Sequence, residues 1–226
     1  LINMFNALGV PEGDQIEHKM LSGAIEKAQK KIEGNNFGVR KNLLEYDQVM
    51  NEQREIIYAE RRRVLDGESM RSVILKSITD IVDNTVDMCI SEDQEKKEWD
   101  LRELVSLLIP VIPLPPEVFK AALEKSEKRD PLKQQLKEAA VKLYEEKEAQ
   151  FPEAEQIREL ERVVLLKVID RKWMDHIDDM EQLRQGIGLQ AYGQRNPLVE
   201  YKMSAYDMFD SMTANIREDS VRLLMH

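Results

Sequence analysis

The sequence of 226 residues has a single cysteine, few strand-forming residues and no long apolar run. The lone cysteine, Cys89, excludes an internal disulfide and any zinc site built from several cysteines, and it fits a reducing compartment. No stretch of eighteen apolar residues occurs, so we expect neither a membrane-spanning helix nor a signal peptide. With 43 acidic against 33 basic residues, the net charge of −10 argues against a nucleic-acid partner bound through a basic face.

The composition indicates an all-α protein. Aromatic residues make up only 6% of the chain, whereas Glu, Lys, Leu, Arg, Met and Ala, all good helix formers, dominate. Proline is absent between Glu12 and Ile109, which permits long helices there. We predict a long scaffold helix, a small inserted helical domain and an antiparallel helical hairpin.

The long helix is predicted from Glu17 to Asp66. Its start has a capping-box-like pair in Asp14 and Glu17, and Gly67 suits a left-handed C-terminal cap. Ten apolar residues repeat with the helical period on one face, within a sector of roughly 60°. They are Leu21, Ile25, Ala28, Ile32, Val39, Leu43, Tyr46, Met50, Ile57 and Val64.

Two further apolar faces leave two alternatives open. They could pack on each other and dock the hairpin along the long helix, or some could stay bare and favour self-association. The face on the long helix comprises Phe37, Leu44, Val49 and Ile56. The face on the first turns of the hairpin comprises Ile157, Leu160, Val164 and Val168.

The middle of the chain, residues 67–155, predicts a small acidic helical domain, since it contains thirteen basic and twenty acidic residues. Its Ile109–Pro116 segment is an apolar loop broken by prolines, which forbids a regular helix. A proline-motif ligand is the less favoured interpretation, because the prolines alternate with aliphatic residues typical of a core.

The hairpin is predicted from two helical stripes joined by a short loop. The segment Glu155–Gln185 contains neither glycine nor proline, whereas Gly186–Asn196 contains three glycines. Asn196 suits a helix N-cap and Pro197 the first helical position. Two stripes of matching length with a short connection are typical of antiparallel helices.

No motif in the chain predicts catalysis. It lacks both a phosphate-binding GxxxxGK[ST] loop and a GxGxxG turn. His176 and Asp179 share a helix face within an acidic cluster, but a metal site needs three or more converging ligands, so a solvated or ion-paired face is the favoured interpretation. Cys89 is expected in the core rather than in a reactive site.

The hairpin loop is locally basic. No acidic residue lies between Glu181 and Glu200, while Arg184 and Arg195 add positive charge. Tyr192 stands near the tip with Leu189 close by, and such side chains are costly to expose unless something contacts them. Folding of Tyr192 back onto the hairpin is the alternative.

Several long motifs resemble the SecA family of bacterial preprotein translocation motors. They are FGVRKNLLEYDQVMNEQR from Phe37 to Arg54, DRKWMDH from Asp170 to His176, and LRQGIGLQAYGQRNP from Leu183 to Pro197. The resemblance covers nearly the whole chain and is weakest between Gly67 and Pro152. It implies a linker from a preceding domain over 1–16, a helical scaffold over 17–66, a helical wing over 67–155 and a two-helix finger over 156–226.

The resemblance also implies a setting for the chain. We expect a non-catalytic segment of a longer ATPase, lacking the nucleotide-binding domains, with no cofactor of its own and with ATP and Mg bound by the parent. The implied partners are the SecY channel complex, the preprotein and the parent's own nucleotide-binding domains. The implied location is cytoplasmic, peripheral to the inner face of the bacterial cell membrane.

Carried over by motif, the implied preprotein or channel contacts are Tyr192, Leu189, Arg184 and Arg195. The implied interdomain coupling set is Arg40, Asp47 and Arg54, which share one helix face at two-turn spacing. Gly188 and Gln190 replace residues that are commonly histidine and basic in the family, which reduces the positive charge of the loop. Two rival classes remain, a free-standing helical interaction adaptor and a metal-dependent hydrolase built on the Asp–His cluster.

Overall fold

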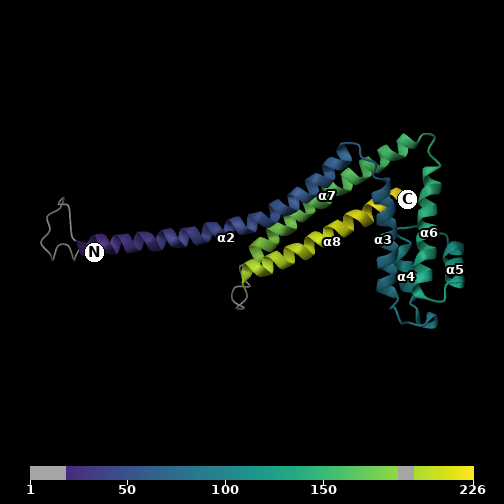
Figure 1. Ribbon diagram of the computed structural model, residues 1–226, viewed down its shortest axis with the longest axis horizontal. Helices are drawn as coiled ribbons and strands as arrows, with labels where there is room; N and C mark the ends of the chain where they lie inside the picture. The colour runs from purple at the N-terminus through teal and green to yellow at the C-terminus, as the bar shows by residue number, and fades with distance from the viewer. Residues whose placement is uncertain (1–18, 188–195) are drawn as a thin grey trace. The chain divides into compact units, whose positions relative to one another are not determined.

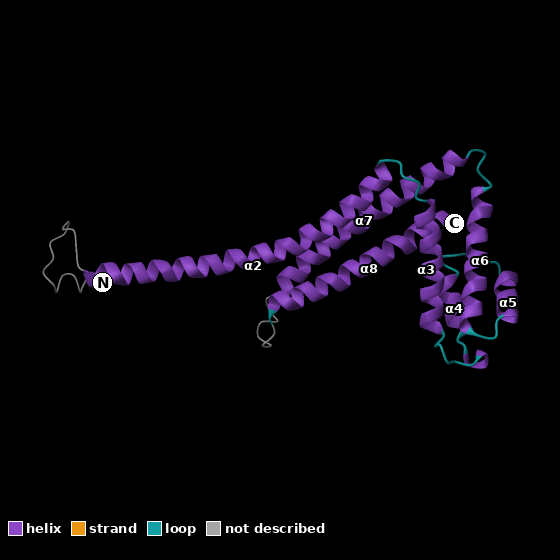
Figure 2. Ribbon diagram, in the orientation of Figure 1, coloured by secondary structure: helices purple, strands orange, loops and turns teal. Residues whose placement is uncertain are grey.

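The computed structural model describes residues 19–187 and 196–226, and these are helical with no strand, as the composition predicts. Figure 1 shows the helices along the chain and Figure 2 their short connections. The bounds are α2 Lys19–Leu65, α3 Arg71–Cys89, η1 Lys96–Glu98 (a 3-10 helix), α4 Leu101–Leu108, α5 Pro116–Lys125, α6 Arg129–Glu148, α7 Ala154–Ile187 and α8 Pro197–Met225.

The chain divides into two compact units, residues 1–48 and 49–226. In the first unit, α2 presents large apolar side chains to solvent. Phe37 is 70% exposed and Leu44 69%, and Ile32 and Val39 of the predicted stripe are exposed as well. The predicted start of this helix at Asp14 and Glu17 lies outside the described residues.

The C-terminal end of α2 confirms the predicted glycine cap. Gly67 has a φ of 81°, which glycine tolerates without a steric penalty. Its N–H donates to the carbonyl of Val64 at 3.3 Å, and the N–H of Glu68 donates to the carbonyl of Arg63 at 3.3 Å. This pair of bonds is the Schellman motif, and it ends the helix before the chain turns toward α3.

In the second unit, α7 and α8 run antiparallel and side by side, which confirms the predicted hairpin (Figure 1). The Asn196 side chain accepts a hydrogen bond from the Leu198 N–H at 3.0 Å, and Pro197 occupies the first turn of α8. The cap and the proline are therefore those that the sequence predicts.

Helices α3 to α6 pack together as a smaller group. Helix α3 packs against α4, α6 and α8, and α5 packs against α6. The loop between α4 and α5 buries Val111, Ile112 and Leu114, so its prolines flank core residues, as the favoured interpretation expects. Cys89 is buried too, and burial raises the pKa of its thiol.

The hairpin packs on the predicted ten-residue apolar stripe of α2 rather than on the further apolar face that contains Ile56. Ile57 and Val64 are buried in one hydrophobic cluster with Leu165, Ile169 and Trp173 of α7. Ile56, from the predicted second face, stays 57% exposed. Of the two alternatives that the sequence leaves open, Ile56 shows the second: it stays bare, because Ile57 and Val64 of the predicted stripe already meet α7.

Candidate functional site

Three elements meet at one buried side chain, Gln53 of α2. Its Nε2 donates to the carbonyl oxygen of Ala205 in α8 at 3.0 Å. Its Oε1 lies 2.8 Å from Nε2 of His176 in α7. One carboxamide thus links the long helix to both arms of the hairpin, and we call Gln53, His176 and Ala205 the hub.

The contacts of Gln53 determine which atom donates the hydrogen bond between Gln53 and His176. Because the Gln53 amide nitrogen donates to Ala205, its oxygen must accept, so His176 donates its Nε2–H. The Ala205 side chain is a buried methyl group, which lets Gln53 reach the main chain of α8. Because buried polar groups are costly to leave unpaired, these two bonds favour the arrangement of α2, α7 and α8 in which both can form.

Aromatic rings enclose His176. The His176 ring lies 5.6 Å from the Trp173 ring and 5.8 Å from the Phe209 ring, centroid to centroid, and Tyr58 of α2 meets Trp173 edge-on at 6.5 Å. His176 is 3% exposed, and burial lowers the pKa of its imidazole, opposed in part by the charge of Asp179. His176 is therefore neutral at neutral pH.

This placement corrects one expectation. The sequence favours a solvated or ion-paired face for His176, but the structure buries it against α2 and α8. In the described part of the chain, no three His, Cys, Asp or Glu side chains converge in a way that could hold a metal ion. No described helix combines the length and apolarity needed to cross a bilayer.

Two half-buried ion pairs join the same helices as the hub. Arg61 of α2 forms a two-pronged contact with Asp170 of α7, with Nε–Oδ1 at 2.8 Å and Nη2–Oδ2 at 3.4 Å. This hydrogen bond raises the pKa of the Arg61 guanidinium. Lys172 of α7 lies 2.7 Å from Asp219 of α8. Together with the hub, these pairs join α2, α7 and α8 along the hairpin.

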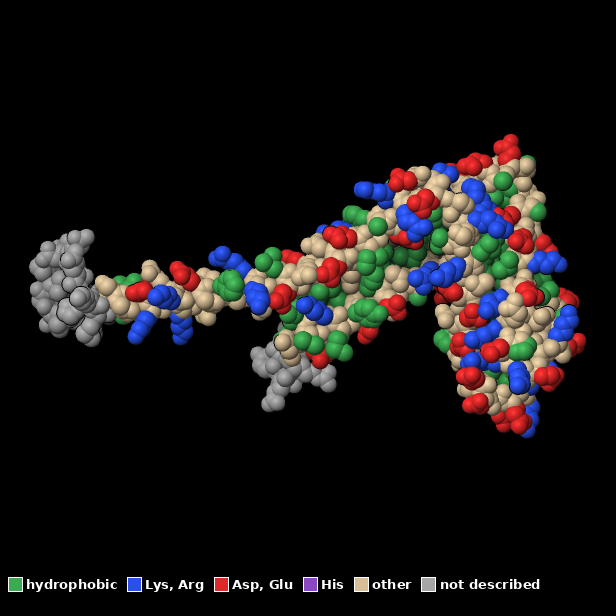
Figure 3. Space-filling model, viewed as in Figure 1, with side chains coloured by type: hydrophobic (Ala, Val, Ile, Leu, Met, Phe, Trp, Pro, Cys, Tyr) green, Lys and Arg blue, Asp and Glu red, His purple; other side chains and the backbone are tan. Residues whose placement is uncertain are grey.

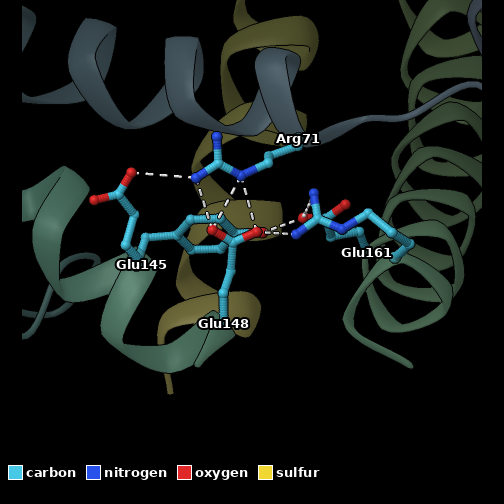
Figure 4. Close-up of polar contacts among 6 residues, drawn as sticks. Arg71, Glu145, Glu148 and Glu161 are labelled. Atoms are coloured by element: carbon cyan, nitrogen blue, oxygen red, sulfur yellow. Dashed lines mark hydrogen bonds and ion pairs between the residues drawn. The ribbon is translucent and has the colours of Figure 1, made fainter. Parts of the chain in front are cut away.

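A second polar cluster, shown in Figure 4, joins α7 to α3 and α6. Arg71 at the start of α3 donates to both carboxylate oxygens of Glu148, at 2.8 to 3.0 Å, and to Glu145 at 3.2 Å. Glu148 also accepts from Arg158 of α7. These hydrogen bonds, from Arg71 above all, lower the pKa of Glu148.

The same cluster contains a fully buried carboxyl group, Glu161 of α7. It accepts a hydrogen bond from the Tyr144 hydroxyl and lies 3.0 Å from Nη1 of Arg158. Burial raises the pKa of Glu161 in spite of these two partners, and burial also raises the pKa of Tyr144. We call Arg71, Tyr144, Glu148, Arg158 and Glu161 the joint.

The residues that the resemblance proposes as site residues are only partly described. Tyr192, Leu189 and Arg195 lie outside the described residues, as do Gly188 and Gln190. Arg184 is exposed on α7 and lies 2.7 Å from Glu181. Arg40 and Asp47 are exposed in the first unit; Arg54 is exposed in the second, where it donates to Asn51 at 3.0 Å. The coupling and contact roles of all these residues stay predictions.

Sequence reasoning missed the hub and the joint because their key residues are polar. Helical spacing could have indicated that both face the core, because residues four apart share a helix face. Gln53 precedes the buried Ile57 by four residues, and Glu161 precedes the buried Leu165 by four. Helical spacing from Ile169 and Trp173 predicts that Ile177 of α7 points inward, but Ile177 is 37% exposed because the neighbouring His176 takes the inward position. Likewise Leu223 of α8 is 55% exposed, whereas Ser220 and Leu224 point inward.

The fold and the site define a structural class, a helical support that holds a hairpin through buried polar contacts. Comparison with known proteins then identifies the family. Residues 15–226 match the family model described as SecA Wing and Scaffold domain, and the chain belongs to that family.

The matching relatives are whole translocase subunits. The chain is 67% identical over all its 226 residues to "Protein translocase subunit SecA" of Lachnoclostridium phytofermentans, covering 26% of that protein. Proteins with the same name from Clostridium acetobutylicum and Acetivibrio thermocellus are 47% and 46% identical, and the chain covers 27% and 25% of them. The chain thus spans about a quarter of the length of these relatives.

Proposed function

We propose that this chain is a non-catalytic mechanical part of a SecA protein translocase. It transmits the ATP-driven motion of nucleotide-binding domains elsewhere in the parent to the hairpin, which moves a preprotein through the SecY channel. Mg and ATP bind those domains and not this segment. The parent works from the cytoplasm, peripherally at the inner face of the bacterial cell membrane.

The observation that supports this proposal best is the hub. A device that transmits motion needs its moving arm fixed to its support, because a loose mount would absorb the displacement. Gln53 bonds both arms of the hairpin to α2 at 3.0 and 2.8 Å in a buried setting. A free-standing adaptor does not need this rigidity, and the family match favours the translocase over that alternative.

The coupling can be tested in a full-length translocase containing this segment. Gln53→Ala removes both hub bonds, whereas Gln182→Ala removes an exposed amide on the same hairpin. We expect Gln53→Ala to keep most ATP hydrolysis and to lose most preprotein transport into membrane vesicles. Gln182→Ala should leave both rates unchanged.

The proposal fails if Gln53→Ala keeps the ratio of transport to ATP hydrolysis at the wild-type value. Circular dichroism of the variant at the assay temperature separates this result from global unfolding. The chain alone should not hydrolyse ATP, and measurable turnover by the purified 226-residue chain would also contradict the proposal.

A further inference from the structure

A cavity of about 280 Å³ lies in the second unit, where α2, α3, α7 and α8 meet. Its wall is mostly aliphatic, with Val64 from α2, Ile74 from α3, Leu165 from α7 and Ile216 from α8. Figure 3 shows hydrophobic side chains gathered in a hollow where α2 and α8 approach α3, with basic side chains near its edge. Cavities of this size and composition are typical of sites for small apolar ligands.

Three hydroxyl groups line the cavity, and two of them have partners inside the protein. Ser77 donates to the Val73 carbonyl at 2.8 Å, and Thr213 donates to the Asp210 carbonyl at 2.8 Å. The third, Ser220, is 2% exposed, and its Oγ has no hydrogen-bond partner. Because buried hydroxyl groups are nearly always bonded, the proton of Ser220 is available to a ligand.

A guanidinium group lines the cavity beside this hydroxyl. Arg217 precedes Ser220 by three residues, so both lie on one face of α8. Among the residues that the structure describes, no carboxylate lies within ion-pair distance of Arg217. Arg217 is thus an exposed charged residue at the edge of a mostly aliphatic cavity, and it forms no ion pair with a described carboxylate.

The other charges near the cavity do not neutralise Arg217. Glu60 also lines the cavity, but it accepts a hydrogen bond from Arg63 at 3.0 Å. Asp80 and Glu218 share a neighbouring hollow with Arg217, and Glu218 pairs with Arg222. An anion at Arg217 would therefore meet a cation that forms no ion pair with a described carboxylate, and the unbonded Ser220 hydroxyl, with Asp80 in the neighbouring hollow.

We propose that this cavity binds one straight-chain fatty acid. The carboxylate accepts from Arg217 and from the Ser220 hydroxyl, and the alkyl chain lies against the aliphatic wall. A water occupies ~30 Å³ in the liquid and a methylene group is of similar size, so a chain of about eight to ten carbons fits. A phospholipid with two chains is too large, which points to the free acid. The inference does not depend on a role in translocation.

The test uses the whole chain with isotope-labelled isoleucine methyl groups, titrated with sodium decanoate and followed by NMR. We expect saturable binding of one molecule, with shifts at Ile57, Ile74 and Ile216, which line the cavity, and none at Ile112 or Ile187, which do not. Arg217→Gln should weaken binding about tenfold, as expected for a lost charge-assisted bond. Arg171→Gln, an exposed arginine outside the cavity, should leave binding unchanged.

Two further variants and two further ligands complete the test. Ser220→Ala should weaken binding several-fold, and Ser220→Met should abolish it by filling the cavity, with thermal unfolding confirming that each variant folds. Decyltrimethylammonium, with the same chain and the opposite charge, should not bind. Equal binding of this cation, unchanged binding in Arg217→Gln, or the same shifts from phosphatidylglycerol vesicles without fatty acid would each overturn the proposal.

Discussion

Gln53 of α2 and His176 of α7 are 123 positions apart in the chain, yet the Oε1 of one lies 2.8 Å from the Nε2 of the other. The same glutamine also bonds the main chain of α8 at Ala205. The attachment of the hairpin thus depends on a buried polar side chain as well as on apolar packing, and the first two predictions concern it.

Replacing Gln53 with alanine leaves the buried His176 N–H without a partner and removes the side-chain bond to the Ala205 carbonyl, which keeps its main-chain bond within α8. An unsatisfied buried polar group costs about 1–3 kcal/mol, so we expect the free energy of unfolding in urea to fall by at least that amount. Gln182→Ala, on an exposed face of α7, should change it by less than about 0.5 kcal/mol. Equal effects of the two changes would show that the hub contributes nothing to stability.

The lowered pKa of His176 predicts a pH dependence. A base whose pKa is lower in the folded state stabilises the fold above its unfolded pKa, and this contribution is lost as pH falls through the folded pKa. We expect the free energy of unfolding to decline as pH falls from ~6.5. The charged side chains that line the same hollow as His176 are those of Lys172, Asp175, Asp179 and Asp207.

His176→Gln gives the matched control, because the new amide can still donate to Gln53 but does not titrate. The slope of stability against pH between about 6.5 and 5 should become flatter in this variant. A slope identical to that of the wild type would show that His176 does not titrate differently in the folded and unfolded states.

The fold could be predicted from the sequence where apolar residues repeat and where caps are local. The stripes of α7 and α8, the cap at Asn196 and the stop at Gly67 all depend on neighbours in sequence, so they could be read directly. The hub and the joint could not, because whether Gln53, His176 or Glu161 is buried depends on which helix lies opposite. That information is in the tertiary packing and not in the local pattern.

The joint predicts a contrast between two substitutions. Arg158→Met leaves the buried charge of Glu161 without its cation, and breaking a buried pair in this way costs about 3–5 kcal/mol. Glu161→Gln removes the charge but keeps an acceptor for Tyr144, so it should cost far less. Chemical unfolding of both variants measures the difference, with the exposed Arg102→Met as the control.

The raised pKa of Glu161 predicts how the stability of Glu161→Gln, relative to the wild type, changes with pH. An acid whose pKa is raised in the folded state contributes stability below its unfolded pKa and loses it as pH rises through the folded pKa. Relative to the wild type, Glu161→Gln should therefore become more stable as pH rises above about 4.5. The opposite trend would mean that the partners of Glu161 outweigh its burial.

The hairpin loop predicts a contact that lies outside the described residues. In a full-length translocase, Tyr192→Cys should cross-link to a stalled preprotein or to the channel, because the sequence predicts an aromatic residue in a locally basic loop that needs a contacting partner. A cysteine at the exposed Gln182, further along the same arm, is the control and should cross-link much less. An active, channel-bound translocase that forms no cross-link at Tyr192 would remove this role.

The central claim is that residues 49–65 of α2 and the hairpin move as one body while the translocase works. It can be tested by joining them covalently where they already touch, with Arg61→Cys and Asp170→Cys in a Cys89→Ala full-length translocase. A short, reducible thiol cross-linker then holds the two helices together. The account predicts that preprotein transport and ATP hydrolysis continue at the rates of the reduced protein. Loss of transport on cross-linking, with ATP hydrolysis maintained and transport restored by reduction, would contradict it.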